Sequence, residues 1–146
     1  MRAKLAAAVA FLAAGLVSCS SEPPPAPNYP AGALPGGTAR MTVNGADNDT
    51  FNDVRCQTDE SFTSITIVKA AQRATVIVDK ADGLVARSVT FNDIGGFTGS
   101  YQHDAQGSAD VSMIDQTFTV TGTAEGFTSD KPGARRSQSF TIKAAC

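Results

Sequence analysis

The first eighteen residues constrain this chain more than any other stretch, because they decide which part of it can belong to the folded protein. Arg2 and Lys4 form a short positive segment, and residues 5–17 are all apolar or small. A helix needs about 20 apolar residues to cross a bilayer, so this run is too short to span one comfortably. A basic start followed by a short apolar run is typical of a secretion signal. We therefore predict that residues 1–18 are a signal peptide.

The apolar run ends in Leu16-Val17-Ser18-Cys19, which resembles a bacterial lipobox. In that motif a cysteine thiol is the nucleophile that accepts the lipid, and small residues before it let the extended chain enter a peptidase. The resemblance implies cleavage between Ser18 and Cys19, with diacylglycerol on the Cys19 sulfur. Two or three acyl chains would then hold the protein on the outer face of the bacterial cell membrane. An ordinary secretion signal with an incidental cysteine is the alternative.

Removal of residues 1–18 leaves 128 residues, which is room for one domain. The loss of Arg2 and Lys4 takes the formal net charge from -2 to -4. This mild acidity is spread along the chain, so it does not favour nucleic acid or an anionic membrane surface as a partner. We expect a monomer whose contact with the membrane is made through the acyl chains on Cys19.

The three cysteines divide into one that takes the lipid and one pair. Export places Cys56 and Cys146 in an oxidising setting, where an even number of cysteines indicates a disulfide. We predict that these two residues are joined. Two free thiols with a metal or redox role are the alternative, but no Cys-x-x-Cys pattern or neighbouring histidine supports it.

Residues 19–37 are predicted to be a lipidated cysteine followed by a tether. Six of the seven prolines lie here, and proline removes backbone donors and restricts φ, so a packed core cannot form. A Pro-rich chain extends by about 3.1 Å per residue, which would lift the domain up to ~50 Å from the bilayer. A Pro-rich recognition peptide is the alternative to a spacer.

Residues 38–146 change to short runs rich in β-branched and aromatic residues. Such runs lie at 40–43, 53–57, 62–68, 75–78, 84–91, 100–101, 109–113, 118–120 and 140–142. Asn44-Gly45 is a strong turn signal, and no convincing amphipathic helix appears. We predict an all-β domain, an antiparallel β-sandwich or strongly curved sheet of about eight strands.

Some details within this domain are also predicted. Residues 46–52 and the segment around Pro132 are expected to be loops, and residues 69–73 could form a single helical turn. Within the run 84–91, the spacing of Val85, Val89 and Phe91 places all three on one face.

No set of residues predicts catalysis, and no cofactor is expected. His103 is the single histidine, and a catalytic or metal site would need partners for it. Asp47, Asp49 and Asp53 form a small acidic cluster without the spacing of a calcium loop, so we interpret them as solvated loop acids. Residues 48–50 match an N-glycosylation acceptor, a signal that is common by chance.

The C-terminal part suggests a family. Thr121-Gly122-Thr123-Ala124-Glu125-Gly126 is followed by a Pro-containing loop, then Phe140-Thr141-Ile142 and a terminal Cys146. This is similar to the Thr-Gly-Thr-Ala-x-Gly turn, last Phe-x-Ile strand and closing cysteine of the mycobacterial LpqH-type lipoprotein antigens. The tether departs from the family pattern, because it is rich in proline rather than in Thr and Ser that can carry mannose.

This resemblance implies a non-enzymatic lipoprotein of the cell envelope. Its implied partners are host receptors that recognise the lipid, or other envelope components, with an adhesin role and no assigned catalysis. A carrier that holds a lipid or glycolipid in a cavity of the β domain is the alternative. A large cavity would remove much of the core of so small a domain, which argues against the carrier.

Overall fold

The computed structural model describes residues 19–146, so the predicted signal peptide, Ser18 included, lies outside the described residues. The described part contains ten strands. They are β1 (Ala39–Val43), β2 (Ala46–Phe51), β3 (Asp53–Asp59), β4 (Phe62–Lys69), β5 (Gln72–Asp79), β6 (Val85–Ile94), β7 (Phe97–Gln102), β8 (Ser108–Ile114), β9 (Thr117–Thr128) and β10 (Lys131–Ala145). The all-β class predicted from the sequence is confirmed. None of residues 19–146 forms a helix that could cross a membrane.

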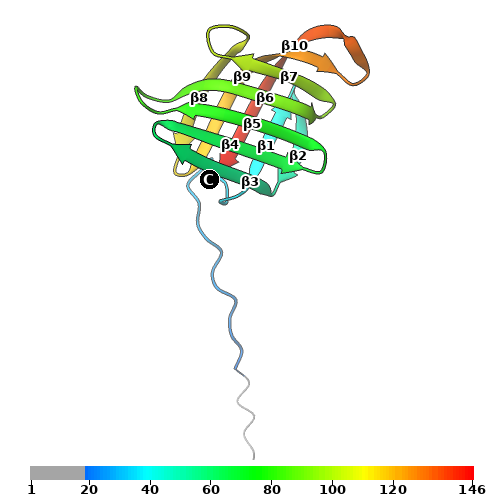
Figure 1. Ribbon diagram of the computed structural model, residues 1–146. Coiled ribbons are helices and arrows are strands. Elements are labelled where there is room, and N and C mark those ends of the chain that lie inside the picture. Colours follow the sequence, from blue (N-terminus) through cyan, green and yellow to red (C-terminus); the bar gives the residue numbers. More distant parts are fainter. Residues whose placement is uncertain (1–18) are drawn as a thin grey trace, which may run out of the picture.

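The strands form one antiparallel sheet in the order β2-β1-β10-β9-β7-β6-β5-β4-β3, and β8 pairs with β9 beside this path. The strands at the two ends of this order, β2 and β3, follow each other in the chain with only Asn52 between them. The sheet must therefore curl until its edges meet at that residue. Figure 1 shows the result, in which β3 to β6 lie across β1, β9 and β10.

Tight turns connect most neighbouring strands. At the predicted Asn44-Gly45 turn, both residues have positive φ, 52° and 76°. This is the geometry of a two-residue hairpin loop whose twist matches that of the flanking strands. The turn joins β1 to β2 as a hairpin, with Val43 opposite Ala46.

Two predictions about loops and turns were wrong, and the first of them accounts for part of the difference between about eight strands and ten. Residues 46–51 form β2 instead of a loop, because its end residue Phe51 is fully buried and the hairpin supplies backbone partners. Residues 69–73 form no helical turn. Ala70 has φ 54° and is the first residue of a hairpin turn. The residues on either side of this turn, Lys69 and Gln72, pair with each other.

The segment around Pro132 was also predicted incorrectly as a loop. It belongs to β10, which begins at Lys131. The register of β10 against β9 shifts between Lys131 and Arg136, so the proline lies at an irregularity in the pairing. Such an irregularity tolerates proline, which has no backbone N–H to donate to a regular ladder.

The predicted inward face of β6 is correct at Val89 and Phe91, which are buried, and wrong at Val85. Ala86 is buried there instead. The register of β6 against β5 shifts at this point, with Arg87 as the extra residue. A bulge of one residue reverses the alternation of a strand, which period-two reasoning from the sequence does not detect.

The core lies between the two crossed parts of the sheet. The buried hydrophobic side chains of β4 and β5 are Ile65, Ile67, Ala74, Val76 and Val78, and those of β1 and β10 facing them include Met41, Phe140 and Ile142. At the centre, the Phe91 ring lies 5.8 Å from that of Phe97 and 5.1 Å from that of Phe140, measured between centroids. These three rings join β6, β7 and β10.

The family pattern led us to expect a turn at the Thr-Gly-Thr-Ala-x-Gly segment. The segment lies within β9 instead. β9 pairs with β10 on one side, and on the other side with β8 and then β7. A Cβ atom on Gly122 would overlap the carbonyl oxygen of Ser108, and one on Gly126 would overlap that of Thr98. The glycines are therefore required by the close approach of neighbouring strands.

We expect Gly126→Ala to lower the free energy of unfolding by about 1–3 kcal/mol, because the overlapped atoms belong to backbone and cannot rotate away. Urea unfolding of the purified domain measures this change. Gly133→Ala is the matched control, since nothing lies within 4 Å of its added Cβ. Equal stability of the two variants would show that β7 and β9 can separate without cost.

Candidate functional site

Cys19, the predicted lipid-attachment residue, is exposed and is the free cysteine of the described chain. The residues that follow it, 20–32, are also exposed and contain no helix or strand. In Figure 1 this segment extends away from the β domain. The thiol is thus sterically accessible at the end of an extended segment.

The last part of the expected tether lies against the β domain. The Leu34 backbone N–H donates to Thr117 Oγ1 at 2.9 Å, and the Gly37 N–H donates to the Ala145 carbonyl at 2.9 Å. Thr117 and Ala145 are both buried. Residues 33–37 therefore cross the ends of β9 and β10, and the freely exposed segment ends near Gly32.

Cys56 and Cys146 form the disulfide that we predicted. Cys56 lies in β3, the last strand in the sheet order, and Cys146 follows β10, the third strand from the other end of that order. The backbone N–H of Cys146 also donates to the Gln116 carbonyl at 3.0 Å. The bond thus closes the curled sheet where strand pairing does not.

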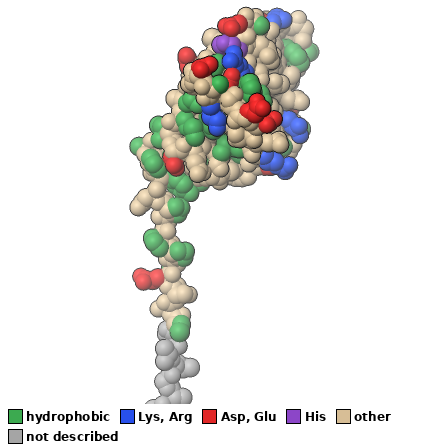
Figure 2. All heavy atoms as spheres, turned by 60° about the vertical axis from the view of Figure 1, so that its left-hand side comes forward, with side chains coloured by type: hydrophobic (Ala, Val, Ile, Leu, Met, Phe, Trp, Pro, Cys, Tyr) green, Lys and Arg blue, Asp and Glu red, His purple; other side chains and the backbone are tan. Residues whose placement is uncertain are grey.

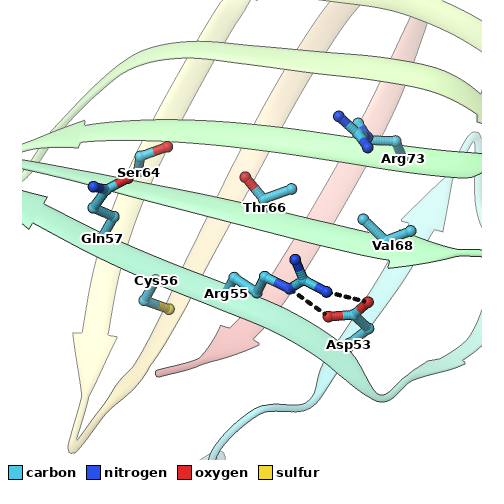
Figure 3. Close-up of a pocket in the computed structure, with 8 residues that line it drawn as sticks. All are labelled: Asp53, Arg55, Cys56, Gln57, Ser64, Thr66, Val68 and Arg73. Carbon is cyan, nitrogen blue, oxygen red and sulfur yellow. Dashed lines mark hydrogen bonds and ion pairs between the residues drawn. The ribbon is translucent and has the colours of Figure 1, made fainter.

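A groove of about 520 Å³ lies on the outer face of β3, β4 and β5. Figure 3 shows the residues that line it, which are Asp53, Arg55, Cys56, Gln57, Ser64, Thr66, Val68 and Arg73. Ser64, Thr66 and Val68 alternate along β4 with the buried Thr63, Ile65 and Ile67. The groove is therefore separate from the core, and it offers a polar outer surface.

The chemistry of the groove suits recognition. Arg55 Nε and Nη2 donate to Asp53 Oδ1 and Oδ2 at 3.1 and 3.3 Å. Arg73 lies directly opposite Val68 in the register of β4 and β5. The lining offers guanidinium, hydroxyl and amide groups, but it contains no nucleophile paired with a base. This site was missed by sequence reasoning, because the register that brings three strands' side chains together cannot be read from the chain.

His103 lies in the turn after β7, as predicted, but its side chain is only 34% exposed. Its Nδ1 lies 3.2 Å from the Tyr101 hydroxyl, and its Nε2 lies 3.2 Å from Asp104 Oδ2. The Tyr101 hydroxyl donates to the Ala86 carbonyl at 3.0 Å, and burial raises the pKa of this tyrosine. The phenol is thus a buried structural donor, which fits His103 as part of a structural network.

A partly buried ion pair lies beside this network. Arg87 Nε and Nη2 both donate to Asp79 Oδ2, at 3.2 and 2.9 Å. The backbone N–H of Ala81 donates to Asp79 Oδ1, and these bonds lower the pKa of Asp79 to about 2. Asp79 therefore stays ionised at neutral pH and holds the β5–β6 connection in place.

The acidic cluster lies on strands, contrary to the loop that we predicted. Asp47 and Asp49 are in β2, and Asp53 begins β3. Each has its own partner: Thr42 Oγ1 donates to Asp47, Lys69 Nζ to Asp49 and the Arg55 guanidinium to Asp53. Within residues 19–146, no group of three or more His, Cys, Asp or Glu side chains is arranged to hold a metal ion.

These features define a class of protein, a small curled β domain carried on an exposed Pro-rich segment with a free cysteine at its far end. Residues 32–146 match the Mycobacterium 19 kDa lipoprotein antigen family, and the chain belongs to this family. This confirms the resemblance drawn from the sequence. The match begins at the residue where the exposed segment reaches the β domain.

Individual relatives are named as lipoproteins. A lipoprotein of Mycobacterium indicus pranii is 37% identical over 148 residues, which cover 100% of both chains. One from Mycobacterium avium subsp. hominissuis is 35% identical over 95% of this chain and 91% of its own. The lipoprotein LppE of Mycobacterium tuberculosis is 29% identical over 92% of this chain and 90% of its own.

Proposed function

We propose that this protein is a non-enzymatic lipoprotein, anchored by acyl chains on Cys19 to the outer face of the cell membrane, that presents its β domain at the envelope surface. The observation that carries the proposal is the free, exposed Cys19 at the start of an exposed segment. A short apolar run ends immediately before this residue. Membership of a lipoprotein antigen family supports the same reading.

Replacing the thiol tests the anchor. We expect Cys19→Ala to move the protein from the membrane fraction to the soluble exported fraction, because the thiol that would accept the lipid is lost. Cell fractionation followed by detection of the β domain measures this shift. Ser20→Ala, which keeps the thiol, is the control and should stay with the membrane. Retention of Cys19→Ala in the membrane fraction would contradict the lipid anchor.

The groove on β3, β4 and β5 supports a role in recognition at the surface. Its polar lining, with Arg55, Arg73 and the hydroxyls of Ser64 and Thr66, can exchange hydrogen bonds with a host receptor or another envelope component. Such a role requires no catalytic group.

A carrier of lipid or glycolipid receives less support from these observations. The groove of about 520 Å³ lies outside the sheet, whereas the interior positions of β4 and β5 are occupied by tightly buried aliphatic side chains. Native mass spectrometry of the β domain distinguishes the two functions. A bare domain is expected, and bound lipid that is lost on denaturation would favour the carrier.

A further inference from the structure

The end of the β domain from which residues 19–32 leave carries exposed apolar side chains. Met113 and Ile114, at the end of β8, are 41% and 46% exposed, and Tyr29 in the leaving segment is 43% exposed. A Cβ built on Gly32 would lie 3.5 Å from Ile114 Cδ1, so the segment leaves the domain beside this strand. Figure 2 shows hydrophobic side chains gathered where the segment meets the domain.

The exposure of Met113 follows from the position of β8 in the sheet. Among residues 19–146, β8 pairs with the first part of β9 and has no strand paired along its other edge. Met113 lies opposite the buried Phe118, so the two side chains are on the same face of the sheet. Because the edge of β8 beside it is open, the Met113 side chain is nevertheless exposed to solvent. Exposed apolar residues at an open edge are a hazard that proteins ordinarily cover or replace with charge.

We propose that this end of the domain, formed by Tyr29, Met113 and Ile114, is a second membrane contact that rests on the lipid bilayer interface. The proposal uses the lipid anchor on Cys19, and so rests on the proposed function. Gly32 lies thirteen positions after Cys19, a reach of about 40 Å at 3.1 Å per residue. The segment leaves the domain at this end, so anchoring on Cys19 holds this end within about 40 Å of the bilayer.

Because the domain is tethered, its contact with the membrane can have a low intrinsic affinity. A linker this short holds the domain at a millimolar effective concentration near the membrane, so a weak surface is occupied for much of the time. Aromatic and aliphatic side chains of this kind favour the interfacial region of a bilayer. Asp115, in the turn that follows Ile114, keeps the contact shallow, because a carboxylate stays with the headgroups and water.

Tryptophan fluorescence tests the contact, because the chain contains no tryptophan. The lipidated Met113→Trp protein is placed in phosphatidylcholine vesicles with and without brominated acyl chains. We expect its emission to shift to shorter wavelength on the vesicles and to be quenched by bromine. Phe127→Trp is the matched control, since Phe127 is 39% exposed but lies at the opposite end of the twelve-residue β9.

Any other result of this experiment overturns the proposed membrane contact. Unshifted emission from Met113→Trp on vesicles to which it remains bound, confirmed with Ile114→Trp, would leave the Cys19 anchor intact and reject the second contact. Equal quenching of the Phe127→Trp protein would show contact without a preferred end. A shift without vesicles that grows with protein concentration would assign this end to a second copy of the chain. Failure of the protein to float with vesicles at all would instead reject the anchor.

Discussion

Replacing Cys56 and Cys146 together by Ser is expected to lower the free energy of unfolding by about 4.5 kcal/mol. The two residues are 90 apart in the chain, so the disulfide closes a loop that includes β4 to β10. In the chain-entropy account, the bond excludes most extended conformations of the unfolded chain, and the loss grows with the logarithm of the loop length. The bond also joins β3 to the end of β10, where no backbone ladder does so.

Urea unfolding of the double variant, beside the oxidised and the reduced parent protein, measures this effect. Reduction should reproduce the double variant, because both remove the same constraint. Cys19→Ser is the control for loss of a cysteine as such, since Cys19 lies in the exposed segment, and its stability should equal that of the parent. A double variant as stable as the parent would mean that strand pairing alone holds the curled sheet closed.

Truncating the central aromatic ring is the second change with a large expected effect. Phe91 is 1% exposed, and its ring packs against those of Phe97 and Phe140. We expect Phe91→Ala to lower the free energy of unfolding by about 3–5 kcal/mol, because it removes buried apolar surface and leaves a cavity between β6, β7 and β10. Chemical denaturation followed by circular dichroism measures the loss.

The control for this truncation is Phe62→Ala, which removes the same atoms from a ring that is 43% exposed. Its effect should be far smaller than that of Phe91→Ala, because a surface substitution away from the core changes stability by about 0.5 kcal/mol or less. If the two variants lost similar stability, the three rings would not be the centre of the core. A variant whose mass shows that the disulfide has been lost would be excluded from the comparison.

Most local features of the fold could be predicted from the sequence, because they depend on neighbouring residues. The all-β class, the Asn44-Gly45 turn and the burial of Val89 and Phe91 follow from period-two patterning and turn chemistry. The predictions that failed, at residues 46–51 and at Val85, concern a polar strand that depends on its partners and a bulge that reverses a face. Tertiary pairing overrides local preference at such positions.

The candidate site was less accessible to sequence reasoning than the fold. The disulfide pair could be predicted, because an even pair of cysteines in an exported chain is a recognisable pattern. Lipid attachment at Cys19 stays a prediction. The groove on β3, β4 and β5 could not, since Arg55 and Arg73 come together only through two successive strand registers. The exposed end near Met113 was equally hidden, because an alternating apolar run predicts burial and does not show that β8 is paired along one edge only.

By itself, the sequence determined the export signature, the tether's composition, the β-rich character and the pairing partner of Cys56, all of which rest on local chemistry or on counting. Only the tertiary structure decided how the sheet curls, with β2 and β3 meeting at Asn52 although they lie at opposite ends of the strand order. It also decided which outward-facing residues share a surface. The reason is physical: strand pairing is a long-range choice, made by the packing of the whole core, and short stretches of chain do not contain it.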